Sequence, residues 1–273
     1  MKICITSTFD REYSLGGMTM MKSIRNHTDC RGVDFKAITS DLEVVREFGP
    51  ENCHFVSDEI KARYANVAYI PELPREKYHH SWYRFEMFSF QGYDRVICID
   101  SDCLCLADMS YLFSDELNAF DIISVEDHIV SKIFVPKMSE YTALGLDLGP
   151  LKIRVRNGRV DIQPALIVAN STVVNEKWYR SLLSYANTTP FRYSIDEGIL
   201  NDFIYLDHLN VKLLPIEYDY QDCYETAGIV QPPSNPIIVH CEESKPFKRD
   251  KASLDSRLHK WHDRWWYEHY LPR

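Results

Sequence analysis

The sequence predicts an α/β fold in which a mostly parallel central sheet is flanked by helices and carries a smaller antiparallel hairpin excursion. Three observations predict this class. Short apolar runs alternate with amphipathic stretches through the first half of the chain, which is typical of a parallel sheet covered on both faces. One of these runs, 96–99, ends on Asp100-Ser101-Asp102. In the second half, Asn157-Gly158 separates two short alternating segments and indicates a two-residue hairpin turn, with positive φ at both positions.

The elements of the first half follow from residue type and spacing. Runs rich in apolar residues predict strands at 3–7, 33–38, 53–56 and 95–100. Between them, apolar residues at helical spacing predict helices at 16–26, at 42–48, from 58 onward and at 80–91. Ligands of such sheets bind beyond the carboxyl ends of the strands, so Asp100 and Asp102 stand where a binding site is expected.

The elements of the second half are mixed in type. We expect strands at 120–125, 165–169, 211–214 and 237–240, hairpin arms at 153–156 and 159–162, and helices at 174–185 and 195–205. Leu254, Leu258, Trp261 and Trp265 recur at helical spacing and predict a last helix over 254–270.

Length and charge narrow the class of protein. At 273 residues the chain can bury a sizeable core, and we expect one domain, 1–273. A formal charge of −9 argues against a nucleic-acid partner. No apolar run is long enough to cross a bilayer, and the first residues form a strand pattern rather than a secretory signal. We therefore expect a cytoplasmic location and reduced cysteines.

Asp100 and Asp102 point to a divalent cation. Two carboxylates one residue apart at the end of an apolar strand repel each other and gain nothing from their neighbours. Hard oxygen ligands suit Mn²⁺ or Mg²⁺, and either ion removes this cost. Two alternatives stay open: a pair of solvated loop aspartates, and a phosphatase of the haloacid-dehalogenase type with Asp100 as the nucleophile. Such phosphatases usually carry Thr or Val where this chain has Leu104.

A second signal lies at 240–247, which reads His-Cys-Glu-Glu-Ser-Lys-Pro-Phe. His240 ends a predicted strand, so its imidazole should emerge at the same sheet edge as the two aspartates. A neutral imidazole beside two carboxylates suits Mn²⁺ especially well, and Lys245 would bring a positive charge to a diphosphate. Taken alone, a histidine at a strand end is more often structural than a ligand.

These segments resemble the signatures of family 8 glycosyltransferases. The first signature corresponds to 93–102 with 108–113 behind it, the second to 240–247, and the resemblance extends from 3 to about 247. It implies a GT-A fold, a UDP-hexose donor (UDP-glucose or UDP-galactose), and Mn²⁺ with Mg²⁺ as the alternative. It also implies transfer to a carbohydrate or other hydroxyl acceptor with retention of anomeric configuration.

The resemblance assigns roles to individual residues. Thr6, Thr8 and Tyr13 match the segment that holds uracil and ribose, and Arg84 and Asp127 match residues that contact the donor. The remaining donor-binding residues are Ser101, Gln163 and Lys245; the metal ligands are Asp100, Asp102 and His240; and Asp196 and Glu197 lie beside the reacting carbon. We divide the domain into a nucleotide-binding half (1–115), an acceptor and metal half (116–250) and a C-terminal aromatic helix (251–273).

The chain departs from the family pattern in three places. Gln163-Pro164-Ala165 stands where the family has Asn-Ser-Gly, and Pro164 removes an N–H donor. The second signature lacks its Gly and is one residue shorter between His240 and Lys245, so a non-catalytic nucleotide-sugar binder stays open as an alternative. Glu197 replaces the usual Gln. It could act as a nucleophile or stabilise an oxocarbenium-like state, or it could only shape the pocket.

Two segments bear on partners. The insertion 129–161 is expected to hold acceptor specificity, and its Arg154, Arg156 and Arg159 would grip an acidic acceptor or form a solvated face. The tail from 260 to 270 is rich in aromatic residues. It is expected to pack against the sheet, with weak peripheral contact to a membrane surface as the alternative.

Overall fold

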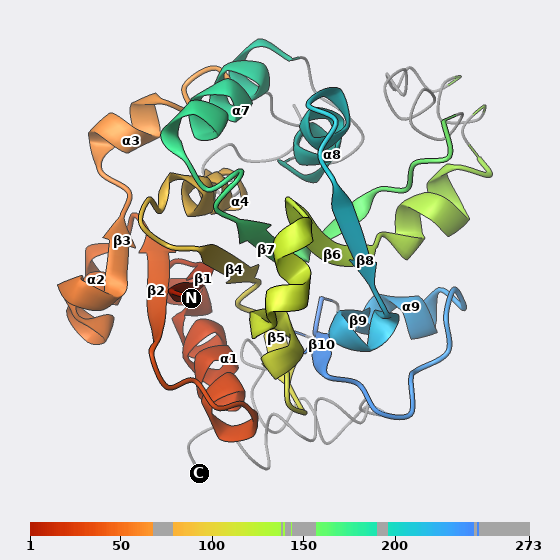
Figure 1. Ribbon diagram of the computed structural model, residues 1–273, viewed down its shortest axis with the longest axis horizontal. Helices are drawn as coiled ribbons and strands as arrows, with labels where there is room; N and C mark the ends of the chain where they lie inside the picture. The colour runs from red at the N-terminus through yellow and green to blue at the C-terminus, as the bar shows by residue number, and fades with distance from the viewer. Residues whose placement is uncertain are drawn as a thin grey trace.

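The computed structural model of the chain describes residues 1–67, 79–137, 139, 143, 157–189, 196–242 and 245. Its centre is a seven-stranded sheet in the order β3-β2-β1-β4-β7-β6-β8, with helices on both faces (Figure 1). The strands are β1 (Ile3–Thr8), β2 (Val33–Thr39), β3 (Cys53–Phe55), β4 (Arg95–Ile99), β6 (Ile122–Glu126), β7 (Ile162–Asn170) and β8 (Val211–Leu214).

The pairing within this sheet is mostly parallel. β1 is parallel to β2 and β4, β2 is parallel to β3, and β6 is parallel to β8. β7 is antiparallel to both of its neighbours, β4 and β6. Every residue of β7 is buried, because the strand lies between two others and both of its faces are covered. The predicted α/β class with a mostly parallel sheet is confirmed.

Helices enclose two apolar layers. On one face lie α1 (Ser14–His27) and α2 (Leu42–Phe48), and on the other lie α3 (Asp58–Ala62), α4 (His79–Tyr83), α7 (Glu176–Thr188) and α8 (Asp196–Leu206). Side chains alternate between the layers along β4: Val96 and Cys98 face α7, whereas Ile97 and Ile99 face α1. In Figure 1, α7 and α8 lie above the sheet and α1 lies below it.

Short helical segments make most of the other connections. The 3-10 segments are η1 (Arg11–Tyr13), η2 (Pro50–Asn52), η4 (Arg84–Ser89), η5 (Ser110–Phe113), η6 (Asp115–Ala119) and η8 (Ile216–Tyr218); η7 (Val130–Phe134) is a π-helix and α9 (Asp222–Thr226) an α-helix. The single helix expected at 80–91 is therefore wrong in type beyond Tyr83. The chain tightens into η4 there, which brings Arg84 beside the end of β4.

A second sheet of three strands, β5 (Cys103–Cys105), β10 (Ile238–His240) and β9 (Tyr220–Gln221), follows the end of β4. The strand predicted at 237–240 exists, but it lies in this small sheet and not at the edge of the central one. The turn at 100–102 explains the difference. The N–H of Cys103 donates to the carbonyl of Asp100 at 3.1 Å, and the chain then leaves the central sheet as β5. β10 pairs with β5, which sets His240 opposite Cys103.

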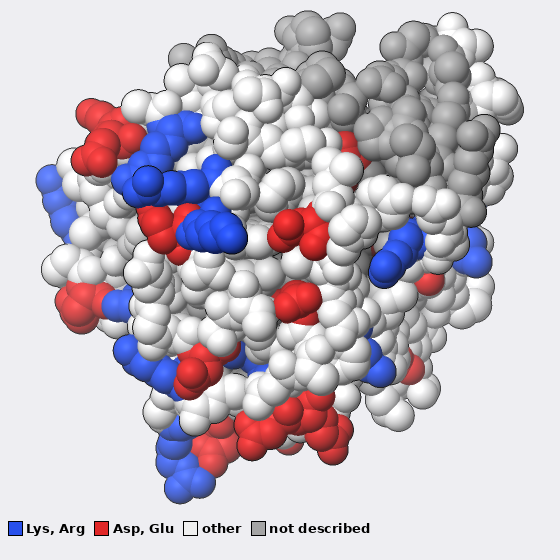
Figure 2. Space-filling model, turned by 45° about the horizontal axis from the view of Figure 1, so that its top comes forward, with Lys and Arg blue, Asp and Glu red and all other residues white. Residues whose placement is uncertain are grey.

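The expected hairpin differs in its turn. Gly158 has a φ of 66°, but Asn157 does not have positive φ, so the turn with positive φ at both positions is wrong. The hairpin arm 153–156, the last helix at 254–270 and most of the insertion 129–161 lie outside the described residues. Among the helices that are described, none is long and apolar enough to cross a membrane. Acidic and basic side chains are interspersed on the face that Figure 2 shows.

Candidate active site

The site begins where β4 ends. The N–H of Asp100 donates to the carbonyl of Ala165 on β7 at 2.9 Å, which continues the strand pairing by one residue. The turn then carries Asp102 inward, and only 6% of this residue is exposed. A buried carboxylate needs compensation. The two aspartates therefore occupy different environments, although they are only one residue apart.

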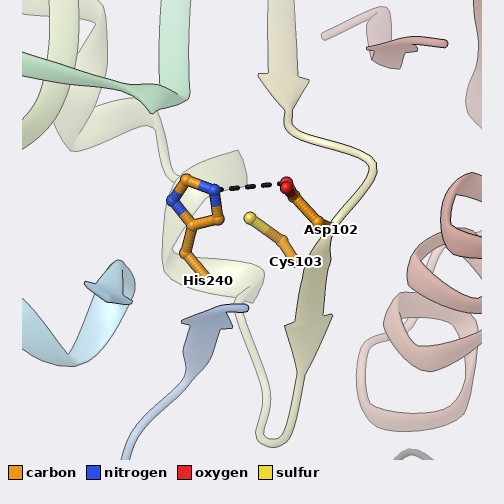
Figure 3. Close-up of side chains that lie close together, drawn as sticks. All are labelled: Asp102, Cys103 and His240. Atoms are coloured by element: carbon orange, nitrogen blue, oxygen red, sulfur yellow. Dashed lines mark ion pairs between the residues drawn. The ribbon is translucent and has the colours of Figure 1, made fainter. Parts of the chain in front are cut away.

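Asp102 is compensated by two cationic side chains. Its Oδ1 lies 3.2 Å from Nε2 of His240 (Figure 3), and its Oδ2 lies 2.6 Å from Nζ of Lys245. Burial acts to raise the pKa of Asp102, but His240 and Lys245 outweigh it and hold that pKa well below its usual value. Burial acts to lower the pKa of His240, whereas Asp102 raises it, and the net pKa is about 10. This describes the site with protein charges alone.

The same residues can receive a cation. Ligand atoms of Asp102, Cys103 and His240 all lie within 4.8 Å of one another. Burial holds the pKa of the Cys103 thiol well above its usual value, so the sulfur is protonated and is a poor ligand. What remains is a carboxylate oxygen and an imidazole nitrogen, a donor pair that fits a divalent cation of the Mn²⁺ class.

Asp100 faces Arg84. Nη2 of this guanidinium lies 3.2 Å from Oδ1 of Asp100, Nε lies 2.7 Å from Oδ2 of Asp196, and Nη1 donates to the carbonyl of Pro164 at 2.7 Å. Burial opposes the charge on Arg84, but Asp100 and Asp196 outweigh it and raise its pKa. Three segments that are far apart in sequence are thus joined by one side chain. Asp102 thus contacts His240, whereas Asp100 contacts Arg84.

Glu197 pairs with a second carboxyl group. Its side chain makes a hydrogen bond with the side chain of Asp127, which is 3% exposed. Oδ1 of Asp127 also accepts the N–H of Val130 at 3.0 Å. Burial first, and then the charge and hydrogen bond of Asp127, hold the pKa of Glu197 well above its usual value. The raised pKa favours the protonated, neutral form of the Glu197 carboxyl group.

A cavity of about 840 Å³ opens beside these groups. The predicted site residues that line it are Thr8, Tyr13, Arg84, Asp100, Ser101, Asp102, His240 and Lys245. Lys245 lies over the ring of Tyr13, with Nζ 5.6 Å from the ring centroid. The cavity has the volume of a ligand site, and polar groups converge on one wall.

Other predicted residues lie outside this lining. The Thr6 hydroxyl donates to the carbonyl of Lys36 at 2.9 Å, inside the central sheet. Oε1 of Gln163 accepts the N–H of Ala165 at 3.2 Å. Asp196 reaches the cavity wall only through Arg84, and Asp127 lies with Glu197. Asp10 and His80 also line the cavity, and the sequence did not predict them. Nε2 of His80 lies 3.5 Å from Oδ2 of Asp10. The signal for Asp10 was its place just after β1.

Comparison with known proteins identifies the class. The model of glycosyl transferase family 8 matches residues 4–144, more than half of the chain. The chain belongs to glycosyl transferase family 8, and the protein is a glycosyltransferase. The match includes Asp100 and Asp102 and ends before Asp196, His240 and Lys245. Comparison with curated protein sequences gave no match.

Solved structures share the fold. An active-site mutant of LgtC, with glutamine changed to glutamate, matches 97% of this chain and 94% of its own at a TM-score of 0.64 and 15% identity. Mouse xyloside xylosyltransferase 1 matches 89% of this chain and 98% of its own, at a TM-score of 0.53 and 12% identity. The bifunctional glycosyltransferase WbbM matches 98% of this chain, at a TM-score of 0.61 and 18% identity. The chain spans about half of WbbM. The predicted GT-A fold is confirmed.

Proposed function

We propose that the protein transfers a hexose from a UDP-sugar, UDP-glucose or UDP-galactose, to a hydroxyl group of a carbohydrate acceptor. One observation carries the proposal. The buried Asp102 and His240 and the half-buried Lys245 form a group of mixed charge on the wall of a large cavity at the end of β4. Such a group can hold a divalent cation and a diphosphate together, which a nucleotide-sugar donor requires.

The cation in this proposal is Mn²⁺, with Asp100, Asp102 and His240 as its protein ligands. Bound there, the ion would neutralise negative charge on the diphosphate. Lys245 is paired with Asp102 at 2.6 Å without an ion. With a cation on Asp102, the ammonium group of Lys245 would be able to contact a phosphate oxygen instead. Asp100 reaches the ion only if its contact with Arg84 loosens.

The rest of the cavity suits the donor. Thr8, Tyr13 and Ser101 lie on its wall, where a nucleoside and a diphosphate can be held. Thr6 and Gln163 contribute through the backbone segments that they anchor. Support for two substrates comes from LgtC, one structure of which is a complex with donor and acceptor sugar analogs at 13% identity and a TM-score of 0.61.

Asp127, Asp196 and Glu197 are assigned to the sugar end, and transfer is assigned retention of configuration. Asp196 is held by Arg84 at 2.7 Å and orients the sugar together with it. The neutral form of Glu197 supports a hydrogen-bonding role, because a protonated carboxyl group is a poor nucleophile. It donates a hydrogen bond much as the family's glutamine amide would.

Release of UDP from a panel of UDP- and GDP-sugars, with Mn²⁺ and with EDTA, tests the function without a known acceptor. We expect release from one UDP-hexose that depends on Mn²⁺ and is lost in Asp102→Ala. The matched control is Asp58→Ala, because Asp58 is exposed and pairs with Lys61 on the surface. Hydrolysis of a phosphomonoester without any release of UDP would instead favour the phosphatase with Asp100 as nucleophile. Binding of UDP-sugar without turnover, over a broad acceptor panel, would favour the non-catalytic binder.

A further inference from the structure

Asp219 is a buried carboxylate behind the candidate cation site. It is the residue that ends η8 and precedes β9, and it is 0% exposed. Neither of its side-chain oxygens accepts a hydrogen bond from the part of the chain that the structure describes. A carboxylate in that position is costly unless another group compensates it. A hydrogen-bond donor or a positive charge would therefore stabilise the Asp219 carboxylate.

One ring nitrogen of His240 also lacks a hydrogen-bond partner among the described residues. Its Nε2 faces Asp102 at 3.2 Å, whereas its Nδ1 is buried and makes no hydrogen bond with any described residue. A ring nitrogen that carries a proton inside a protein needs an acceptor. His240 and Asp219 thus each lack the kind of group that the other offers.

The strand pairing brings the chain at Asp219 close to His240. β9 and β10 are parallel, with His240 paired to Gln221, and Asp219 comes two residues before Gln221. Asp219 itself lies outside β9, as the residue that immediately precedes the strand. The largest charge–charge interaction of Asp219 is with His240, ahead of its interactions with Asp100, Glu242 and Asp102. All three of those groups are repulsive, so His240 is the compensating charge.

Coordination chemistry explains what this pair is for. A histidine that binds a cation through Nε2 must be neutral, and its one remaining proton then sits on Nδ1. Metal-binding histidines almost always donate that proton to a carboxylate, a carbonyl or a water, which fixes the tautomer and the ring orientation. Asp219 is a buried carboxyl group whose charge acts on this ring and whose oxygens accept no hydrogen bond from a described residue.

We propose that Asp219 is a positioning residue of the cation site: in the cation-bound protein, its carboxylate accepts the Nδ1–H of the neutral His240 and holds Nε2 toward the ion. The inference rests on the proposed function, because it assumes that Asp102 and His240 hold a divalent cation. Gln221 assists, as the strand partner of His240 whose buried Nε2 makes no hydrogen bond with any described residue. Its Oε1 is engaged by the thiol of Cys223 at 3.3 Å.

The test compares Mn²⁺ affinity in Asp219→Asn and wild-type protein. Loss of free Mn²⁺ signal in electron paramagnetic resonance measures binding to the full-length chain without any substrate. Outer carboxylates of this kind typically change metal affinity by about 10- to 100-fold, and we expect a weakening of at least about tenfold. The control is Asp202→Asn, a buried aspartate that accepts a hydrogen bond from Tyr185 at 3.2 Å on α8.

A second measurement keeps the proposal testable if Asp219→Asn folds poorly. Nitrogen-15 spectra of wild-type protein, assigned with His240→Gln, should show a proton on Nδ1 of His240 in the Mg²⁺-bound form. Nδ1 without a proton would overturn the proposal. Wild-type Mn²⁺ affinity in folded Asp219→Asn would also overturn it, while leaving the proposed function intact. Absence of any Mn²⁺ binding by the wild-type chain would contradict both, and donor turnover that persists in EDTA would show that the function survives without a cation.

Discussion

Nζ of Lys245 lies 2.6 Å from Oδ2 of Asp102, on the wall of the cavity that we assign to the donor. The two residues are 143 positions apart in the sequence. Burial acts to lower the pKa of Lys245, but Asp102 outweighs it, and the ammonium group stays charged. This ammonium group therefore contacts a carboxylate oxygen that the proposed cation would bind. Without a diphosphate, Lys245 and the cation would compete for Asp102.

Replacement of Lys245 by Met should have opposite effects on two ligands. Mn²⁺ binding without nucleotide should tighten several-fold, because a competing cation is removed from Asp102. UDP binding in the presence of Mn²⁺ should weaken by about tenfold, equivalent to ~1.4 kcal/mol, because a charged donor to phosphate is lost. Calorimetric titration measures both. The account fails at this point if both affinities move in the same direction, and Lys61→Met, which changes an exposed pair, should alter neither.

Replacement of Arg84 by Lys should reduce donor turnover more than donor binding. A lysine cannot reach Asp100, Asp196 and the Pro164 carbonyl together, so α8 loses its link to β4. We expect turnover to fall by about 100-fold, the size of effect that misplaced catalytic groups produce. UDP release under saturating donor measures it. Arg180→Lys on the exposed face of α7 serves as the control, and equal turnover in Arg84→Lys and wild type would remove the positioning role.

Replacement of Glu197 by Gln separates its two assigned roles. Burial and Asp127 raise the pKa of Glu197, so the group loses its proton only at a pH above its usual range. If the neutral acid is the working form, wild-type turnover falls on the alkaline side, and Glu197→Gln keeps turnover within about threefold while losing that alkaline decline. A pH profile of UDP release decides. Abolished turnover in Glu197→Gln, with intact UDP binding, would restore the nucleophile.

Glu86 should make stability depend on pH. The carboxyl group is fully buried and accepts hydrogen bonds from Tyr64 at 2.6 Å and from Tyr179, with Nε2 of His54 at 3.0 Å. Burial acts to raise its pKa, but these partners outweigh it, and the net pKa is lowered. A lowered folded pKa gives stability that is present above the unfolded pKa, near 4.5, and is lost as the pH falls through the folded value.

Urea unfolding at pH 7 and at pH 4 measures this contribution. Glu86→Gln should cost about 1–3 kcal/mol at pH 7, because the charge that the buried donors face is removed. The loss of stability between pH 7 and pH 4 should be smaller in the variant than in the wild-type chain. An identical pH dependence in the two proteins would show that Glu86 does not carry the effect. Glu59→Gln, which removes an exposed charge, should change the free energy of unfolding by no more than about 0.5 kcal/mol.

The order of strands and helices could be predicted because hydrophobic periodicity is local. The helix at 42–48 and the strand at 211–214 have the predicted bounds. The pairing of β10 with β5 could not be predicted, because it depends on how the turn after β4 redirects the chain. Local pattern identifies a strand but does not tell which sheet it joins.

In the candidate site, too, some residues could be predicted from the sequence, whereas their contacts could not. Asp100, Asp102 and His240 stand out in the sequence because charged or titratable groups follow apolar runs. Their different partners could not be read from it, since Arg84 reaches Asp100 and Asp196 only through long-range packing. Asp219 was missed, although a charged residue between Tyr218 and Tyr220 was a visible signal of a buried carboxylate. The assigned roles of the site residues stay predictions.

Binding of UDP to the full-length chain, titrated calorimetrically with Mn²⁺ and again with EDTA, tests the central claim most directly. It requires neither an acceptor nor knowledge of the sugar. The account predicts saturable binding of UDP with Mn²⁺, at least about tenfold weaker binding in EDTA, and the same weakening in Asp102→Ala when Mn²⁺ is present. UDP binding of equal strength in Mn²⁺ and EDTA, or no binding in either, would contradict a donor held through a cation at Asp102 and His240.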